Sequence, residues 1–349
     1  MSPVTARTAR GLLVGVLAGA VLAAACDLPA SSRARTASPS SDSASPSPAG
    51  TPAGSPAETP PEPIAWQRGP DAPLALTEVA AAAHDGAIWV AGGLSADGRA
   101  VTDVLVLDPV EKTWTRAPSL PVAVHHAALV SDGADLWLLG GYEGDAFDRP
   151  TDRILRLTGD AWAEDAPLPE PRAAGAAAWD GVGRLIYVGG VGPGGVRGSV
   201  HARDRDGWRL LGDLPEGREH TSAASDGEGH VFVLGGRRGG LDTNVATVEL
   251  VEPDGGLRRL GTLPTPRGGV AAFWWPTLGA CLAGGESPAG TNPQVECIDL
   301  DGRVTVLPSL ARPRHGLGAA VVDGTAHVLL GGEQPGLFVS PIVEALVLQ

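Results

Sequence analysis

The sequence predicts an all-β fold, namely a six-bladed β-propeller that fills residues 64–349. Three observations predict this fold. Gly-Gly pairs recur at steps of 46 to 49 residues, a short apolar run precedes each pair, and an Asp-Gly turn signal precedes most of those runs. The six pairs begin at Gly92, Gly140, Gly189, Gly235, Gly284 and Gly331. A unit of about 48 residues with four short strands has the size of one propeller blade.

Each unit is expected to contain four antiparallel strands. The first is rich in Ala, as in residues 80–83 and 176–178, because six strands converge at the axis of a propeller and large side chains would collide there. The second strand is the apolar run that ends at the Gly-Gly pair. The fourth carries Trp114, Trp162 or Trp208 in three of the units, which suits the rim, where the blades diverge and wide gaps need filling.

The two ends of the repeat region predict how the ring closes. The sixth unit ends at Gln349 after three strands, so its rim strand is missing. Trp66 lies 48 residues before Trp114, at the place of a rim Trp. We therefore expect the segment at Trp66 to complete the last blade with a strand from the N-terminal side, which removes a free sheet edge.

The first 26 residues resemble a bacterial lipoprotein signal. Arg7 and Arg10 precede an uncharged apolar run of 15 residues, Gly11–Ala25, which is shorter than the roughly 20 residues that cross a bilayer. Small residues then lead to Cys26, at the place of the cysteine that is lipidated in such signals. Residues 1–25 are thus expected to be a signal peptide and Cys26 the lipidated residue. The alternative is an ordinary secretory signal with Cys26 as an unmodified thiol.

Residues 27–63 consist almost entirely of Ser, Pro, Ala, Thr and Gly, without an aromatic residue. Such a segment buries too little apolar area to fold, so we expect a disordered linker. The protein is then expected to be exported and lipid-anchored on the outer face of a bacterial membrane, at the cell surface or in the periplasm. The net charge of −14 argues against a nucleic-acid partner, because binding phosphates requires clustered Lys and Arg.

The repeating unit resembles the kelch repeat, whose hallmarks are a Gly-Gly pair after an apolar strand and a downstream Trp. The resemblance covers residues 64–349 in six copies, and it implies a propeller of the galactose oxidase and kelch type. The pattern departs from the repeat in places. Units five and six lack a rim Trp of their own, and unit five has Trp275-Pro276 where Asp-Gly is expected.

Candidate ligand-binding residues fall in the loops that enter the innermost strands. Four arginines lie 17 residues before a Gly-Gly pair: Arg172, Arg218, Arg267 and Arg314. The same loops contain Glu78, His125, His126, Glu219, His220 and His315. If these side chains converge at one mouth of the channel, the guanidinium groups offer rigid forks for a carboxylate or phosphate. The alternative is that the arginines are part of the repeat and pair with backbone carbonyl groups.

Two residue pairs in unit five have both a structural and a functional interpretation. Cys281 and Cys297 lie on neighbouring antiparallel strands, so they are a candidate disulfide in an oxidising compartment. The alternative is two buried thiols on different sides of the blade. Trp274 and Trp275 are either a platform for a sugar or packing between blades.

No metal site and no cofactor are predicted. The histidines are distributed as one or two per blade, without the paired spacing that defines a ligand set. No nucleophile elbow, phosphate-binding loop or dinucleotide motif occurs. A copper radical oxidase is excluded, because that class needs two ligand tyrosines, whereas Tyr142 and Tyr187 are the only ones and Tyr187 lies within a repeat strand.

The leading functional hypothesis is a non-catalytic module that binds a protein, glycan or small ligand at one face of the propeller. The irregular loops after the Gly-Gly pairs, at residues 142–150, 191–198 and 286–294, are candidates for that contact. The alternative is an exported enzyme similar to the kelch-type mutarotases, acting on an acidic sugar such as sialic acid. Polar convergence at a channel mouth would favour the enzyme, and an apolar outer patch would favour the scaffold.

Overall fold

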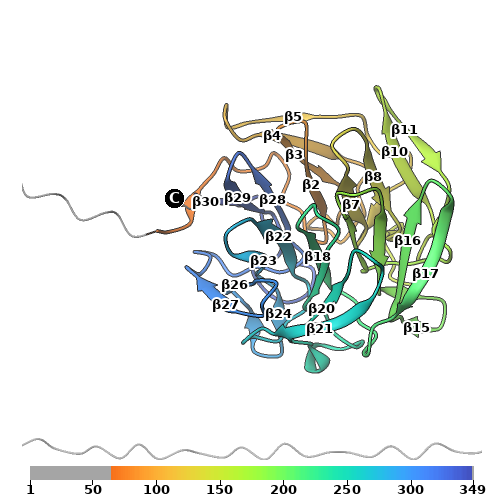
Figure 1. The fold of residues 1–349 in the computed structure, drawn as a ribbon. Coiled ribbons are helices and arrows are strands. Elements are labelled where there is room, and N and C mark those ends of the chain that lie inside the picture. The colour runs from red at the N-terminus through yellow and green to blue at the C-terminus, as the bar shows by residue number, and fades with distance from the viewer. Residues whose placement is uncertain (1–63, 348–349) are drawn as a thin grey trace, which may run out of the picture. The chain divides into compact units, whose positions relative to one another are not determined.

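The computed structural model describes residues 64–347, and the predictions for residues 1–25, Cys26 and residues 27–63 lie outside this range. Within it the chain forms six four-stranded antiparallel sheets arranged radially around one axis (Figure 1). The prediction of an all-β propeller with six blades is therefore confirmed. Among the described residues, no helix is long and apolar enough to cross a membrane.

The first three blades follow one another along the chain. Each sheet runs from an inner strand at the axis to an outer strand at the rim. Blade one comprises β2 (Ala80–His84), β3 (Ala87–Ala91), β4 (Val104–Asp108) and β5 (Thr113–Arg116). Blade two comprises β7 (Ala128–Ser131), β8 (Leu136–Leu139), β10 (Ile154–Thr158) and β11 (Ala161–Asp165). Blade three comprises β12 (Ala176–Trp179), β13 (Leu185–Val188), β16 (Ser199–Asp204) and β17 (Gly207–Asp213).

The other three blades repeat this order, and the last of them takes its outer strand from the N-terminal side. Blade four comprises β18 (Ser222–Ser225), β19 (Val231–Leu234), β20 (Thr247–Val251) and β21 (Leu257–Thr262). Blade five comprises β22 (Ala271–Trp275), β23 (Gly279–Ala283), β26 (Val295–Ile298) and β27 (Val304–Leu307). Blade six comprises β28 (Gly318–Val322), β29 (Thr325–Leu329), β30 (Val343–Val347) and β1 (Gln67–Arg68).

Short elements near the Gly-Gly pairs decorate one face of the disc. They are the hairpins or pairs β6 (Val124–His125) with β9 (Tyr142–Glu143), β14 (Val191–Gly192) with β15 (Gly195–Val196), and β24 (Glu286–Ser287) with β25 (Gly290–Thr291), and the single-turn helix η1 (Leu241–Thr243). We call this side the Gly-Gly face. The hairpins that join the first and second strands of each blade lie at the opposite face, because each first strand runs away from the Gly-Gly face.

The inner strands form a closed ring. Each of them lies against the inner strand of the next blade, and β28 lies against β2. The core consists of apolar clusters between neighbouring blades; one of them joins Ile88 and Leu105 of blade one to Leu329 and Val343 of blade six. The alternation of side chains along each strand presents one set to each neighbouring blade, so every sheet is covered on both faces.

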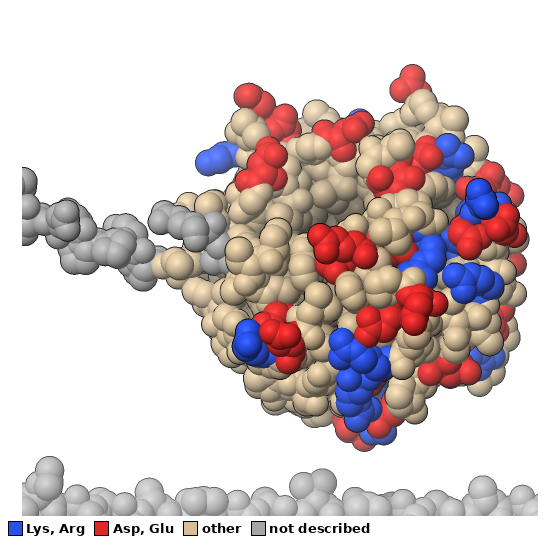
Figure 2. Space-filling view, viewed as in Figure 1, with Lys and Arg blue, Asp and Glu red and all other residues tan. Residues whose placement is uncertain are grey.

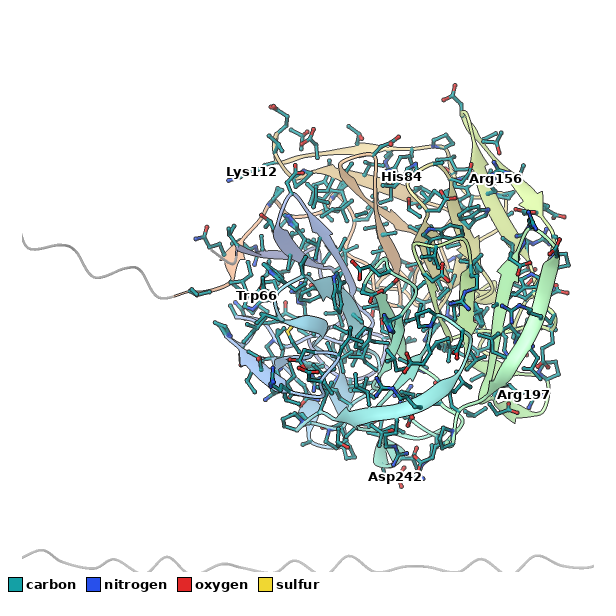
Figure 3. The ribbon with its side chains drawn as sticks, viewed as in Figure 1. Trp66, His84, Lys112, Arg156, Arg197 and Asp242 are labelled. Carbon is teal, nitrogen blue, oxygen red and sulfur yellow. A yellow bond between two sulfur atoms is a disulfide. The ribbon has the colours of Figure 1, made fainter. Side chains whose placement is uncertain are left out.

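The predicted closure of the ring is confirmed. Residues Gln67 and Arg68 pair antiparallel with Ala345 and Glu344 of β30. Trp66, which lies at the rim beside blades five and six (Figure 3), is buried. Both ends of the propeller thus meet in one sheet.

Blade five contains the two residue pairs that had alternative interpretations. Cys281 and Cys297 are directly opposite each other on β23 and β26 and form a disulfide. Trp275 is buried in the cluster that surrounds this disulfide. Trp274 packs against Phe232 of blade four, with the ring centroids 5.4 Å apart. Both Trp side chains therefore fill space within and between blades, as the packing interpretation expects.

Candidate functional site

A ring of backbone hydrogen bonds surrounds one end of the channel, on the Gly-Gly face. It is built from one residue per blade, each with positive φ: Glu78, His126, Ala174, His220, Gly269 and Gly316. From His126 onward, the backbone N–H of each member donates to the carbonyl oxygen of the member before it, over 2.7 to 3.1 Å. The N–H of Val79 donates to Gly316 at 3.4 Å and completes the circle. We call this ring the channel mouth.

The left-handed backbone at the mouth aims three functional side chains at the axis. Glu78, His126 and His220 have φ of 52°, 56° and 51°, a conformation that costs a non-glycine residue about 1 kcal/mol or more. Blades five and six have Gly at the corresponding position, where no such cost arises. Blade three has Ala174 in the same conformation. Polar residues such as Glu and His in a strained conformation are common at functional sites.

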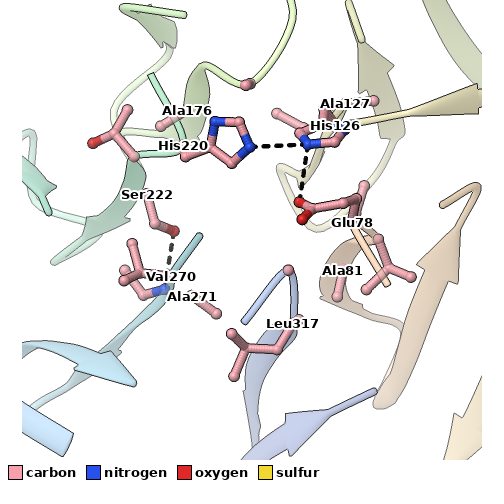
Figure 4. A pocket seen from close by; sticks show the side chains of 18 of the residues that line it. Glu78, Ala81, His126, Ala127, Ala176, His220, Ser222, Val270, Ala271 and Leu317 are labelled. Atoms are coloured by element: carbon pink, nitrogen blue, oxygen red, sulfur yellow. Dashed lines mark hydrogen bonds and ion pairs between the residues drawn. The ribbon is translucent and has the colours of Figure 1, made fainter. Parts of the chain in front are cut away.

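The inner strands enclose a channel of about 140 Å³ below this mouth. Its wall is formed largely by small residues such as Ala81, Ala127, Ala176 and Ala271, which the close-up in Figure 4 shows around the axis. The surface is hollowed near the centre of the disc in Figure 2. The predicted Ala-rich inner strands therefore line an open channel, with Glu78, His126 and His220 at its end.

These three side chains contact one another (Figure 4). The Nε2 atom of His126 lies 3.1 Å from a carboxylate oxygen of Glu78 and 3.0 Å from the Nε2 atom of His220. One possible ligand atom from each of the three residues lies within 4.8 Å of the other two. The sequence predicted that Glu78, His126 and His220 share a mouth, and the structure places them there.

A second set of side chains orients the first, and each partner contacts a different member. Glu219 accepts a hydrogen bond from Nδ1–H of His220. The Nδ1 atom of His125 contacts Nδ1 of His126. His315, the residue before Gly316, has its Nδ1 atom 3.4 Å from the second oxygen of Glu78. Glu219 and His315 are thus also at the mouth, as the sequence predicted, but behind the three residues that line the channel.

Arg237 connects blades four and five at the mouth. Its guanidinium group donates to Glu219 at 2.9 Å, to Glu286 at 2.7 Å and to Nε2 of His220 at 3.0 Å. Because Nδ1–H of His220 faces Glu219, its Nε2 atom carries the lone pair, and that lone pair accepts from Arg237. Arg237 and Glu286 are the residues directly after a Gly-Gly pair. Glu286 begins the loop at residues 286–294 that the sequence analysis named as a candidate contact, whereas Arg237 was not among the candidate residues.

Burial and charge set the protonation states at the mouth. Burial lowers the pKa of His126, and burial together with the neighbouring His126 lowers the pKa of His220 well below its ordinary value. Burial opposes the ionisation of Glu78, but attraction to His126 and the hydrogen bond from His315 outweigh it. Burial also opposes the protonation of His315, but its hydrogen bond and attraction to Glu78 outweigh that effect. The pKa of Glu78 is therefore lowered and the pKa of His315 is raised. At neutral pH, His126 and His220 are neutral imidazoles beside an ionised Glu78.

Aromatic side chains border the mouth on blade two. Tyr142, on β9, is buried, whereas Phe147 in the following loop is 49% exposed. The ring centroid of Phe147 lies 5.3 Å from that of His126 and 4.8 Å from that of His125. An exposed aromatic face thus adjoins the polar groups, within the irregular loop at residues 142–150.

The four arginines that were expected at the mouth point into the blades instead. Arg172, Arg218, Arg267 and Arg314 have at most 2% of their surface exposed, and none of them lines the channel. Arg267 shows the pattern: it donates to the carbonyl oxygens of Gly284 and Leu282 and lies 2.7 Å from a carboxylate oxygen of Glu296. The structure does not bring these four guanidinium groups together, and their geometry agrees with the structural interpretation.

The spacing of 17 residues has a structural cause. Arg218 and Arg267 each reach the carbonyl oxygen of the first Gly of the pair 17 residues later, at 3.4 and 2.7 Å. Their carboxylate partners occur on the third strands, where Val-Glu recurs. The three ion pairs are Arg218 with Glu249 at 3.5 Å, Arg267 with Glu296 at 2.7 Å and Arg314 with Glu344 at 2.6 Å. The recurring Val-Glu is a sequence signal that could have identified this role, although the sequence analysis did not use it. Blade three has Val200-His201 there, and Arg172 pairs with Glu170.

Comparisons with known proteins agree with this architecture. The kelch motif matches residues 75–121, which contain all of blade one. The solved structure of YjhT aligns with a TM-score of 0.68 over 80% of this chain and 97% of that chain, at 13% sequence identity. No curated protein matches the sequence significantly.

The fold defines a six-bladed β-propeller, and its first blade contains a kelch motif. At 13% identity, the likeness to YjhT shows a shared fold. The function of this chain must therefore be argued from its own residues at the channel mouth.

Proposed function

We propose that this protein is an exported propeller that binds a small hydroxyl-rich molecule, such as a sugar, at the channel mouth. The convergence of Glu78, His126, His220 and Arg237 at one opening carries the proposal. Burying ionisable groups is costly unless they serve a purpose, and clusters of buried groups with shifted pKa values mark functional sites. Five of the six blades contribute to the site. Glu78 comes from blade one, His126 from blade two, His220 and Arg237 from blade four, Glu286 from blade five and His315 from blade six.

The depth of the polar groups favours a small ligand over a protein partner. The side chains of His126 and His315 are 3% and 2% exposed, so a broad protein surface would not reach them. Phe147, exposed beside His126, offers a flat apolar face of the kind that packs against a sugar ring. Small-ligand sites commonly combine aromatic faces with a few placed polar groups.

The charges at the mouth favour a neutral ligand over an acidic one. Three carboxylates, of Glu78, Glu219 and Glu286, face the two basic side chains of Arg237 and His315, so the carboxylates outnumber the basic groups. Arg237 is already bonded to two of the carboxylates, so it has little attraction left for an anion. The acidic sugar that the resemblance to mutarotases implied is therefore a poorer match than a neutral sugar.

A second candidate function is proton transfer on the hemiacetal of the bound sugar, as in a mutarotase. The donor Nε2–H of His126 and the acceptor Nε2 of His220 are 3.0 Å apart, and the two oxygens of a hemiacetal share one carbon. Once Arg237 has withdrawn from its Nε2 atom, neutral His220 would take the hydroxyl proton and then give it, as an imidazolium, to the ring oxygen, to which the Nε2–H of His126 would donate a hydrogen bond. The ring opens to a carbonyl and closes on the other face by the reverse transfers, so atoms and charge balance.

We also propose that the protein is exported and lipid-anchored through Cys26. The signal-like residues 1–25 and the linker at residues 27–63 support this from the sequence alone. The disulfide between Cys281 and Cys297 supports an oxidising compartment, since such bonds are rare in the cytosol. Mass measurement of the protein from membranes of the native host tests it: an N-terminal diacylated Cys26 is expected, and a chain cut elsewhere and free of lipid would contradict the anchor.

Thermal unfolding with a panel of neutral and acidic monosaccharides tests ligand binding. A ligand at about 100 times its Kd stabilises the folded state by roughly 2.7 kcal/mol, which raises Tm by a few degrees at this size. Phe147→Ala is expected to weaken binding by about three- to tenfold, the range that one aromatic contact supplies. Val182→Ala, at an exposed hairpin on the opposite face, is the matched control. A panel without any shift would count against the proposal.

Proton transfer has its own test. The rate at which a pure anomer equilibrates is followed by NMR with the full-length protein and with His220→Gln. Acceleration by the wild type and its loss in the variant support the enzyme. Binding without acceleration leaves the non-catalytic module as the function.

A further inference from the structure

We propose that Glu78, His126 and His220 bind one divalent transition-metal ion, of which Zn²⁺ is the representative, at the channel mouth. This goes beyond the proposed function, because it rests on the three ligand atoms alone and would hold whether or not a sugar binds. Two imidazole nitrogens and one carboxylate oxygen are a common ligand set for Zn²⁺ with a fourth position open to solvent or substrate.

The ligand atoms are already close to the required spacing. Zn²⁺ binds imidazole nitrogen and carboxylate oxygen at about 2.0 to 2.2 Å, so neighbouring ligand atoms in a tetrahedral site lie roughly 3.3 to 3.5 Å apart. The distances here are 3.0 Å between the two Nε2 atoms and 3.1 Å between His126 and Glu78, and one possible ligand atom from each of the three residues lies within 4.8 Å of the other two. Side-chain shifts of a few tenths of an ångström at the shorter contacts would suffice.

Each of the three ligands has its own orienting partner. Glu219 bonds Nδ1 of His220, His125 contacts Nδ1 of His126, and His315 contacts the second oxygen of Glu78. Such outer contacts fix the tautomer of a ligating His and raise its basicity, and metal sites in proteins rely on them. Both Nδ1 atoms are engaged behind the site, which leaves both Nε2 atoms for the ion.

The electrostatic surroundings admit a cation. The groups that face the site are the carboxylates of Glu78, Glu219 and Glu286 and the basic side chains of Arg237 and His315, so the carboxylates outnumber the basic groups. Arg237 contacts Nε2 of His220, so its Nη2 atom must withdraw from that nitrogen when an ion binds, while its bonds to Glu219 and Glu286 hold the guanidinium group nearby.

The open side of the site leads into the channel. The three ligands line the cavity of about 140 Å³, so the remaining coordination position faces a space that holds water or the oxygen of a ligand. Hard cations such as Mg²⁺ and Ca²⁺ prefer oxygen ligands alone, so they should not compete for two imidazoles. The site is thus expected to select transition metals.

Titration of the chelator-treated full-length protein with Zn²⁺, followed by calorimetry, tests the proposal. One ion per chain is expected, with no binding of Mg²⁺. Glu78→Gln and His220→Gln are expected to lose at least a hundredfold in Zn²⁺ affinity, and the orienting variant Glu219→Gln about ten- to a hundredfold. His84→Gln, whose imidazole bonds Ser131 away from the mouth, is the control and should bind as the wild type does. Co²⁺ should give a visible spectrum that the first two variants lose.

Two results would overturn the metal site: absence of stoichiometric Zn²⁺ binding, or binding that Glu78→Gln and His220→Gln leave unchanged while their melting curves show folded protein. Sugar binding is measured separately on the metal-free protein. If the protein binds Zn²⁺ but no sugar, the proposed function alone is refuted. If it binds a sugar but no Zn²⁺, the metal site alone is refuted. Because the ion occupies the Nε2 lone pairs, Zn²⁺ should also stop any anomer equilibration.

Discussion

The indole Nε1 of Trp66 donates a hydrogen bond to the carbonyl oxygen of Pro308 at 2.7 Å. In this contact the outer strand segment of blade six bonds to the segment that leaves blade five. The same bond joins two other rim pairs, Trp114 to Pro70 at 3.1 Å and Trp162 to Pro118 at 2.9 Å. Trp66 therefore joins neighbouring blades as the other rim Trp residues do, although it reaches its blade from the other end of the propeller.

Removing Trp66 should open the ring at its closure. Trp66→Ala deletes a buried aromatic side chain and is expected to lower the free energy of unfolding by about 3 to 5 kcal/mol. Trp66→Phe removes mainly the hydrogen bond and should cost about 1 kcal/mol. Chemical denaturation of both variants measures this. If both variants lose the same small amount of unfolding free energy, closure of the ring does not depend on the side chain of Trp66.

The buried ion pairs should stabilise blades and leave the site unaffected. Removing Arg267 leaves the carboxylate of Glu296, which is 2% exposed, without its ion-pair partner. Arg267→Met is therefore expected to lower the free energy of unfolding by about 3 to 5 kcal/mol. Arg267→Met with Glu296→Leu should recover part of that loss, because no buried charge is left alone. Arg303→Ala, at an exposed pair, is the control with a change below about 0.5 kcal/mol.

Ligand and Zn²⁺ affinity separate the two interpretations of these arginines. If Arg267 belongs to the repeat, the folded double variant binds sugar and Zn²⁺ as the wild type does. If the double variant is as stable as the wild type but binds sugar or Zn²⁺ more weakly, Arg267 contributes to ligand binding.

The fold was predictable because the sequence pattern of one blade occurs six times along the chain. The steps between Gly-Gly pairs set the number of blades, and the distance from Trp66 to Trp114 identified the closing strand. Each blade is one copy of the same local pattern, so a departure in one copy, such as Trp275-Pro276, does not hide the period. Alternation along each strand then placed the core.

The site was predictable only in part, because it depends on where single side chains point. Arg218 and His220 are two residues apart in one loop, yet Arg218 turns into its blade while His220, with φ of 51°, faces the channel. A single sequence contains no pattern that predicts this difference in side-chain direction. Arg237 and Glu286 follow Gly-Gly pairs, a position where other blades have residues as different as Leu94 and Val191, so composition gave no signal.

Gly316 should control the position of Glu78. A Cβ atom at Gly316 would lie 2.5 Å from Oγ1 of Thr77 and 2.7 Å from a carboxylate oxygen of Glu78. Gly316→Ala is therefore expected to displace that carboxylate and to lower Zn²⁺ affinity by tenfold or more. Gly324→Ala has a similar φ, +70° against +58°, and no atom within 4 Å of its new Cβ.

Both alanine variants should lose about 1 kcal/mol of stability to backbone strain, but only the first should lose Zn²⁺ affinity. Calorimetric titration of the two proteins side by side makes the comparison. Equal Zn²⁺ affinities in the two variants would show that Glu78 does not contribute a ligand from its present position.

His327 should make the propeller less stable in acid. It lies on β29, is 6% exposed, and burial lowers its pKa to about 4, below the ordinary value of 6.5. Below pH 6.5 the imidazole of His327 takes up a proton more readily in the unfolded chain than in the folded one. The contribution of His327 to the free energy of unfolding is therefore complete above pH 6.5 and is lost as the pH falls toward 4. Between pH 7 and 5.5 the loss should reach up to about 1 kcal/mol, with water access reducing it.

Replacing His327 with Leu removes this proton uptake, so the variant should show a flatter dependence of unfolding free energy on pH over that range. Urea denaturation at half-unit pH steps measures the slope for both proteins. NMR titration of the His327 ring protons in the wild type supplies the independent check, with a midpoint near pH 4 expected. An unchanged slope in His327→Leu, or a ring that titrates at its ordinary pH, would mean that water reaches this imidazole in the folded blade and that acid destabilisation arises at other buried histidines such as His125.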